Sequence, residues 1–295
     1  MERFEGRTAV VTGGASGIGR GMAEAFAAEG MNIVIADVEA SALEAAAAEM
    51  KSSGVEVTGV QCDVADPGSV DALARAALDA YGAVHVLCNN AGVAGGTGPT
   101  WERPLDDWDW VMGVNVRGVL HGIRSFVPIM IEQGDEGHIV NTASMAGLIP
   151  GGGTYGVSKS ACVALSESLF GELAGAAPKI GVSVLCPGWV RTRIMESERN
   201  RPEAPRQVDA PPNPLVEQMR SLVGKAIGDG LDPRKLGDIV VDAIRTRRFY
   251  ILTHDWQDMI EHYMRLVIDG NDPIGKPPPG INLADLLGTE GAADA

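Results

Sequence analysis

The chain has little of what marks membrane, secreted or nucleic-acid-binding proteins. It contains no apolar run near the roughly 20 residues that span a bilayer, and residues 1–6 form no apolar signal-peptide core. Only 24 Lys and Arg stand against 39 Asp and Glu, which gives a net charge of −15. Because nucleic acids and anionic membranes are bound through clustered Lys and Arg, we expect neither as a partner. We therefore expect a cytoplasmic protein.

Cysteine is scarce as well. The four cysteines are Cys62, Cys88, Cys162 and Cys186; none belongs to a Cys-x-x-Cys pair, and none has a histidine at a metal-ligand spacing. Three of them lie near the ends of apolar, strand-like runs and Cys162 lies in a helical pattern, so we expect buried free thiols. The five histidines are scattered too, and we expect no metal site.

Apolar residues make up 45% of the chain and charged residues 21%, which is enough to bury a sizeable core. Short apolar runs alternate with helical patterns. The strands expected are 9–11, 33–36, 55–60, 84–88, 137–142, 180–185 and a seventh at 249–252; the helices expected between and after them include 18–29, 41–50, 67–81, 233–247 and 256–268. This alternation predicts right-handed βαβ units and a doubly wound α/β fold with a parallel sheet.

The amino-acid composition of the chain changes after residue 187. Five prolines interrupt a polar, Arg-rich stretch that contains one helical pattern at 215–227. Loops this long in compact domains are usually lids or binding loops. We expect one catalytic domain over 1–270 with a substrate-binding lid at 187–230 inserted in it, followed by a tail at 271–295.

A glycine-rich turn lies between the first predicted strand and helix. It contains Gly13, Gly17 and Gly19 in a G-x-x-x-G-x-G spacing, together with Ser16 and Ile18. Such glycines let the backbone approach a pyrophosphate, whose charge is favoured at a helix N-terminus. Asp37 closes the second strand, where a carboxylate accepts hydrogen bonds from the adenosine ribose and repels a 2′-phosphate. The pattern favours NAD over NADP; a purely structural turn, with Asp37 as a helix N-cap, is the alternative.

Two further helical patterns carry polar residues on their apolar faces. In the first, Asn115 falls within an apolar stripe that runs from Trp108 to Phe126, and Pro128 is expected to kink or end the helix. A buried Asn is either a satisfied structural amide or part of a polar site. In the second helix, Tyr155 and Lys159 form an i,i+4 pair on one face. Lysine on a buried face is uncommon without a function or a counterion.

Taken together, these motifs resemble the short-chain dehydrogenase/reductase family. The matching segments are 12–19, Asn89-Asn90-Ala91-Gly92, Asn115, Ser144, 155–159 and 187–192, and the likeness covers about 5–252. One departure is the gap of 11 residues from Ser144 to Tyr155, a residue or two shorter than the family pattern. The glycines at 151–153 must absorb it, which affects the wall of the site more than the catalytic assignment.

The resemblance implies a Rossmann-type fold and hydride transfer, with Tyr155 as general base. A free phenol has a pKa of about 10, and positive charge from Lys159 and an oxidised nicotinamide favours the phenolate. Lys159 would also hold the nicotinamide ribose, Ser144 the substrate oxygen, and Asn115 a water linked to Lys159. The cofactor residues it implies are Asn89 and Gly92 by the adenosine ribose, Asp63 and Val64 by the adenine, Thr192 by the carboxamide, and Ala91, Pro187, Gly188 and Val190 nearby.

The substrate expected is a secondary alcohol or its ketone, of medium size, with aromatic and alicyclic compounds as candidates. The predicted pocket walls are mostly apolar: Ala146, Leu148, Thr154, Trp189, Ile194 and Met195. Segments 106–115 and 126–128 also resemble bacterial members that oxidise benzylic or steroid-like alcohols. The alternatives are an NAD-dependent epimerase or lyase and a nonenzymatic NAD-binding protein.

Two local features of the composition each allow two interpretations. Glycines within helices, at 113, 118, 122, 171 and 175, cost helix propensity, which a homodimer or homotetramer interface or intramolecular packing would explain. Residues 186–254 carry a net charge of +3 in an otherwise acidic chain. Their arginines, Arg193 and Arg199 among them, are either solvated or placed to contact a substrate carboxylate or a cofactor phosphate.

Overall fold

A parallel sheet of seven strands forms the centre of the computed structural model, which describes residues 1, 3–96, 98–149, 151–202 and 214–273. The strands are β1 (Thr8–Thr12), β2 (Asn32–Asp37), β3 (Val57–Gln61), β4 (Val86–Asn89), β5 (Gly137–Thr142), β6 (Ile180–Cys186) and β7 (Tyr250–Leu252). Their order is β3-β2-β1-β4-β5-β6-β7, and every neighbouring pair is parallel. The predicted doubly wound α/β fold is confirmed, with strand ends displaced by one or two residues.

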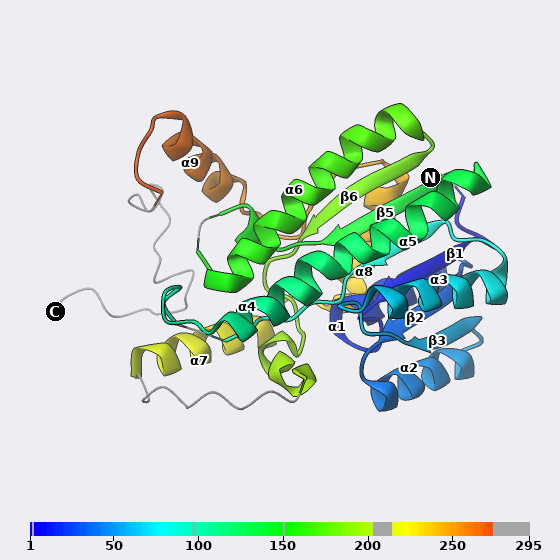
Figure 1. The fold of residues 1–295 in the computed structure, drawn as a ribbon, viewed down its shortest axis with the longest axis horizontal. Helices are drawn as coiled ribbons and strands as arrows, with labels where there is room; N and C mark the ends of the chain where they lie inside the picture. The colour runs from blue at the N-terminus through cyan, green and yellow to red at the C-terminus, as the bar shows by residue number, and fades with distance from the viewer. Residues whose placement is uncertain (2, 97, 150, 203–213, 274–295) are drawn as a thin grey trace.

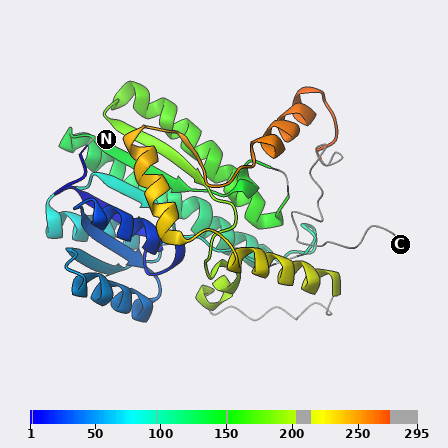
Figure 2. The ribbon, with the colours of Figure 1, turned by 180° about the vertical axis from the view of Figure 1, so that it is seen from behind.

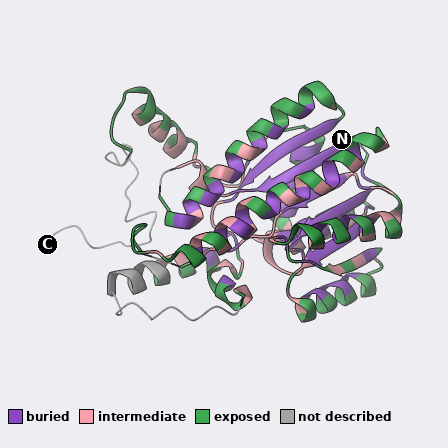
Figure 3. Cartoon of the chain, viewed as in Figure 1, coloured by how far each residue is buried: buried purple, intermediate pink, exposed green. Residues whose placement is uncertain are grey.

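Helices cover both faces of this sheet (Figures 1 and 2). One face carries α1 (Gly17–Ala28), α2 (Ala40–Ser52) and α8 (Pro233–Arg245), and the other carries α3 (Pro67–Tyr81), α5 (Gly118–Gln133) and α6 (Gly153–Ala176). The remaining helices are α4 (Leu105–Met112), α7 (Pro214–Gly228), α9 (Gln257–Ile268) and the short turns η1 (Gly113–Arg117), η2 (Met145–Gly147) and η3 (Ile194–Asn200). Figure 3 shows buried strands between helices whose outer faces are exposed.

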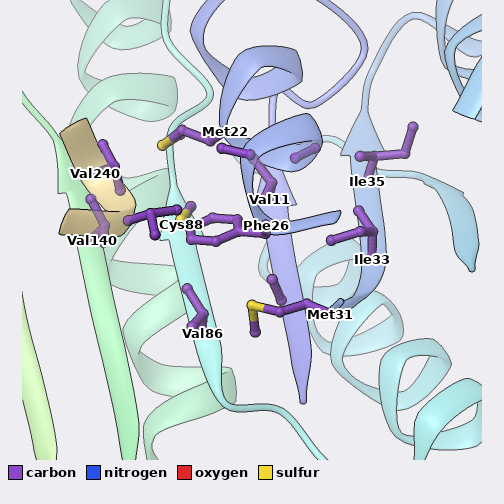
Figure 4. Packing of buried hydrophobic residues seen from close by; sticks show 14 of the residues in the cluster. Val11, Met22, Phe26, Met31, Ile33, Ile35, Val86, Cys88, Val140 and Val240 are labelled. Atoms are coloured by element: carbon purple, nitrogen blue, oxygen red, sulfur yellow. The ribbon is translucent and has the colours of Figure 1, made fainter. Parts of the chain in front are cut away.

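The apolar strands fill two cores, one on each face of the sheet. On one face, Phe26 and Met22 of α1 pack with Val240 of α8 against Ile33 and Cys88 (Figure 4). The neighbouring residues along each strand point to the opposite core, because side chains alternate across a sheet. Strands buried on both faces are nearly continuous apolar runs, which is why the sequence pattern located them. The four cysteines are buried and free, as predicted.

The helix expected around Asn115 is interrupted, which corrects the sequence interpretation. A π-helical turn, η1, separates α4 from α5, and the N–H of Gly118 bonds to the carbonyl of Gly113. Pro128 lies inside α5, which continues to Gln133, so the helix does not end at this proline, and the alternative of a kink stays a prediction. The apolar stripe survives the turn because Val111, Asn115, Val119 and Phe126 are all buried.

Packing within the chain explains two of the glycines in helices and does not explain two others. A Cβ on Gly118 would lie 2.8 Å from Val64, and one on Gly122 would lie 1.9 Å from Asn89, so close intramolecular packing requires both. Gly171 and Gly175 on α6 face open space. A homodimer or homotetramer stays a prediction. The predicted lid contains η3 and α7, while residues 203–213 and most of the tail at 271–295 lie outside the described residues. None of the helices in the described part of the chain is long and apolar enough to cross a membrane.

His138 is a buried histidine on β5. Its Nε2 lies 2.7 Å from the Ser183 hydroxyl, and burial lowers its pKa from 6.5 to about 3. Between these two values the unfolded chain binds a proton that the folded chain does not. The contribution of His138 to stability is therefore fully present above about pH 6.5 and is lost as the pH falls.

We expect the free energy of unfolding to fall with acidity less steeply in His138→Gln than in the natural chain. Glutamine presents an Nε2 donor to Ser183 but does not titrate. Between about pH 7 and about pH 5 the difference should be about 2 kcal/mol, measured by urea denaturation at both pH values. His85 and His254, whose pKa values burial also lowers, are present in both proteins and cancel. Equal slopes would contradict the assignment.

Candidate active site

A cavity of about 650 Å³ opens at the carboxyl ends of the strands. Parallel α/β sheets bind ligands at this edge. Sixteen of the predicted site residues line it: Gly13, Ser16, Gly17, Ile18, Asp37, Asp63, Val64, Ala91, Gly92, Ser144, Tyr155, Lys159, Pro187, Gly188, Val190 and Thr192. Residues that are far apart in the sequence thus meet around one space.

The glycine-rich turn lies under this cavity and needs its glycines. Gly13 and Gly17 have φ values of +64° and +52°, a left-handed conformation that side chains disfavour. Gly19 does not line the cavity: a Cβ there would lie 2.1 Å from the Gly13 carbonyl oxygen, so this glycine lets α1 approach the turn. Ser16 makes no side-chain cap, and the first N–H groups of α1 remain available to an anion.

Asp37 ends β2 beside the same turn. One carboxylate oxygen accepts a hydrogen bond from the Ala15 N–H at 3.2 Å, and the other accepts from the Glu39 N–H at 3.1 Å. These bonds fix the carboxylate against the turn and leave further lone pairs for a ligand hydroxyl. The N-cap residue of α2 is Glu39, so the alternative interpretation of Asp37 as a helix cap is not supported.

The two asparagines at the end of β4 lie in different surroundings. Asn89 does not line the cavity, because it is the last residue of a buried strand and donates from Nδ2 to Asn141 Oδ1 at 2.9 Å. Asn90 lines the cavity instead, and its Nδ2 donates to the Thr12 carbonyl at 2.9 Å. Thr12 Oγ1 in turn accepts from the Asn90 N–H. Asn90 therefore braces the glycine-rich turn, and only the alternation of side chains along β4 could have revealed this.

Tyr155 and Lys159 lie one turn apart near the start of α6 and both line the cavity. Lys159 is 3% exposed, and its Nζ donates to the Thr142 carbonyl at 2.9 Å. The same Nζ lies 5.6 Å from the centre of the Tyr155 ring. The phenol and the ammonium are both groups that can hydrogen-bond to a ligand in the cavity. The pair can therefore serve proton transfer at the cavity wall.

Asn115 lies behind this pair and outside the cavity lining. Its Oδ1 accepts from the Val93 N–H, and its Nδ2 donates to the Val93 carbonyl and to Ser158 Oγ, each at 2.9 Å. A Cβ on Gly92 would lie 3.3 Å from Lys159 Nζ and 3.4 Å from Asn115 Oδ1, so both groups approach the same point. The amide joins the segment after β4 to α6. This positions Lys159 relative to the cavity.

Ser144 follows β5 and also lines the cavity. It is the N-cap of η2, where its Oγ accepts from the Ala146 N–H at 3.2 Å. The shortened segment before Tyr155 closes through three glycines with positive φ values, of +120° at Gly151, +78° at Gly152 and +53° at Gly153. Only glycine adopts such a sequence of angles at low cost. The glycines thus absorb the short gap, and Gly151 and Gly152 become part of the cavity wall.

The apolar walls differ in part from those predicted. Ala146, Trp189, Ile194 and Met195 line the cavity, whereas Leu148 and Thr154 do not. Leu148 packs with the core beside β6 instead, and Thr154 is buried. Sequence reasoning missed further wall residues, which are Trp110, Ile149, Val223, Ile227 and Trp256. Trp256 lies beyond β7, and no local pattern connects it with Tyr155.

Three arginines of the predicted lid pair with acidic residues of the chain itself. The pairs are Arg191–Asp232, Arg199–Glu39 and Arg201–Asp107. Burial opposes ionisation of Glu39, but Arg199, Asn200 and Arg193 outweigh it and hold the pKa of Glu39 below its usual value. Arg199 is thus paired within the chain, while Arg193 lines the cavity and acts electrostatically on Glu39.

The described part of the chain contains neither an activated cysteine thiol at the cavity nor a cluster of metal ligands. Cys62 lines the cavity and Cys186 lies near it, but burial raises the pKa of both thiols, that of Cys186 to about 12. Such thiols stay protonated and are poor nucleophiles. Among the described residues, no group of three or more His, Cys, Asp or Glu side chains is placed to hold a metal ion.

Comparison with known proteins agrees with this geometry. The short chain dehydrogenase family model matches residues 7–203. A short chain dehydrogenase/reductase from Burkholderia phymatum, solved in complex with NAD, is 43% identical with a TM-score of 0.89, covering 93% of this chain and 99% of that one. A CLA biosynthesis dehydrogenase/reductase from Lactiplantibacillus plantarum is 35% identical, over 92% of this chain and 96% of that protein.

A more distant structure shows what the fold leaves open. An actinorhodin polyketide ketoreductase variant is 29% identical with a TM-score of 0.72, covers 87% of this chain and 98% of that one, and was solved with NADPH. Structures of the same fold therefore carry either nicotinamide cofactor. The choice between them depends on side chains around the adenosine ribose.

Proposed function

The chain belongs to the short-chain dehydrogenase/reductase family of oxidoreductases, and from this premise we propose that it transfers a hydride between a secondary alcohol, or its ketone, and NAD. The observation that carries the proposal is the Tyr155–Lys159 pair, which lines the same cavity as the glycine-rich turn. The glycines at 13 and 17 and the uncapped start of α1 form a cradle that fits a pyrophosphate. Bound nicotinamide would supply the hydride acceptor or donor.

In this mechanism each polar wall residue has one task. Tyr155 takes the proton of the substrate hydroxyl, and Ser144 orients the same oxygen. Lys159, fixed by the Thr142 carbonyl, holds a ribose hydroxyl. Asn115 keeps α6 and the segment after β4 in register. The apolar residues beyond Tyr155 exclude water from the reacting carbon.

Asp37 supports NAD as the cofactor. Its carboxylate is fixed by two backbone N–H groups at the edge of the cavity, where it would accept from ribose hydroxyls and repel a 2′-phosphate. The NAD-bound relative from Burkholderia phymatum is consistent with this choice.

We expect Asp37→Ala to lower the preference for NAD over NADP by roughly tenfold to a hundredfold, because it removes hydrogen bonds to the ribose and a repulsive charge. The measurement is kcat/KM with each cofactor at a saturating alcohol concentration. Asp79→Ala, an exposed acid on α3 outside the cavity, is the matched control. An unchanged preference in Asp37→Ala would remove Asp37 from cofactor selection.

The two alternatives give different products in the same assay. A dehydrogenase accumulates NADH in proportion to the alcohol consumed, whereas an epimerase or lyase converts substrate without net NADH. A nonenzymatic NAD-binding protein binds NADH and exchanges no hydride with any alcohol or ketone. Net NADH formation therefore separates the proposal from both.

A further inference from the structure

Three tryptophans line the cavity that also contains Tyr155. They are Trp110, Trp189 and Trp256. The chain has only five tryptophans, and aromatic residues make up only 5% of it. Met195 of η3 and Ile227 of α7 add aliphatic surface. We call these five residues the apolar subsite. Tryptophans gathered around one cavity favour a ligand with a large apolar surface.

Two of these tryptophans are held in a fixed arrangement. The rings of Trp189 and Trp256 meet edge to face, with centroids 6.2 Å apart and planes at 77°. His254 lies 5.7 Å from the Trp256 ring, and its Nδ1 lies 2.8 Å from Thr253 Oγ1. A Cβ on Gly188 would lie 2.7 Å from His254, so the imidazole packs directly on the backbone after β6. The wall is thus formed before a ligand arrives, which lowers the entropy cost of binding.

The charged side chains near this wall interact with acidic residues of the chain itself. Arg199 pairs with Glu39, two residues after Asp37, and Arg193 acts on the same carboxylate. Arg201 pairs with the buried Asp107. Burial lowers the pKa of His254, which keeps its ring neutral. None of the five side chains of the apolar subsite is charged, so the desolvation of a charged group there would be uncompensated.

We propose that the apolar subsite takes a neutral secondary alcohol or ketone whose reacting carbon bears an aromatic ring, and that this ring packs against Trp189 and Trp256. The inference rests on the proposed hydride-transfer function, which supplies the reacting carbon beside Tyr155. A flat ring gains edge-to-face or stacked contacts with both indoles that a saturated ring of equal size does not. The subsite therefore distinguishes aromaticity as well as bulk.

A matched pair of ketones tests this without turnover. Acetophenone and cyclohexyl methyl ketone differ only in the saturation of the ring, and neither reacts with the oxidised cofactor. We expect acetophenone to bind the complex of the natural chain with NAD about tenfold more tightly, measured by titration calorimetry. Equal affinities, or no binding of either ketone, would overturn the inference.

Substitutions of Trp189 and Trp256 test whether these two side chains cause the preference for acetophenone. Trp256→Leu and Trp189→Leu should each reduce the ratio of the two affinities to about twofold or less, while Trp256→Phe should keep most of it. Trp101→Leu is the matched control, because Trp101 is 84% exposed and outside the cavity. A preference that survives both leucine variants would overturn the assignment of the ring to this wall.

Turnover separates this inference from the proposed function. The natural chain should oxidise 1-phenylethanol with a kcat/KM about tenfold above that for 1-cyclohexylethanol. If NAD and acetophenone bind with the expected preference but no alcohol yields NADH, the apolar subsite stands and the dehydrogenase proposal fails. If both alcohols are oxidised equally well, the dehydrogenase proposal stands and the aromatic preference fails.

Discussion

Replacing Tyr155 by phenylalanine is expected to lower alcohol-dependent NADH formation at least about a thousandfold, while NADH binding is retained. The hydroxyl oxygen is the atom that takes the substrate proton in the proposed mechanism, and phenylalanine lacks it. The ring that lies 5.6 Å from Lys159 Nζ remains, so the cavity keeps its shape. Loss of turnover without loss of binding distinguishes a chemical role of Tyr155 from a structural one.

The measurement combines steady-state NADH formation with NADH affinity from fluorescence titration. Tyr81→Phe is the matched control: its hydroxyl accepts a hydrogen bond from Thr58 at 3.1 Å, away from the cavity. This variant should keep the turnover of the natural chain. If Tyr155→Phe turned over within about tenfold of the natural chain, another group would have to be the base.

The fold and the catalytic pair follow from local pattern because local geometry determines both. Strands buried on both faces require continuous apolar runs, and parallel strands require helices between them. Tyr155 and Lys159 share a face because residues i and i+4 adjoin on any α-helix. The glycine-rich turn was recognisable because Gly13 and Gly17 need positive φ values that few other residues adopt.

The sequence pattern does not reveal features of the structure that depend on a shift of one residue along a strand or helix, or on contact between segments far apart in the chain. Asn89 and Asn90 are adjacent, and whichever ends inside β4 points into the core, so a shift of one residue exchanges their roles. The π-helical turn at Asn115 leaves the apolar stripe intact and so is invisible in the pattern. Trp256 reaches the cavity through tertiary packing against the core beside β6.

Asp107 is the clearest case of a residue that only the tertiary structure reveals. In the sequence nothing distinguishes Asp107 from the acidic residues beside it. In the structure it is 1% exposed and accepts hydrogen bonds from Arg103, from Arg201 and from the Gly96 N–H. Burial opposes its ionisation, but the two guanidinium groups outweigh burial and hold the pKa of Asp107 below its usual value. The network therefore ties the end of η3 to α4.

We expect Asp107→Asn to lower the free energy of unfolding by about 3–5 kcal/mol, because removing one partner of a buried ion pair leaves the other charges uncompensated. Urea denaturation near pH 7 measures this loss, with Asp109→Asn, an exposed acid on the same helix, as the matched control. A loss below about 1 kcal/mol would show that the arginines find other partners.

The same substitution tests whether the network also shapes the cavity. Arg201 lies 4.3 Å from the Trp110 ring and directly follows η3, whose Met195 lines the apolar subsite. Releasing Arg201 from Asp107 frees this segment, so KM for the alcohol should rise severalfold more than kcat falls, because Tyr155 and Lys159 are fixed independently by α6 and Thr142. Equal changes in both would mean that the network positions the reacting groups themselves and that α6 depends on it.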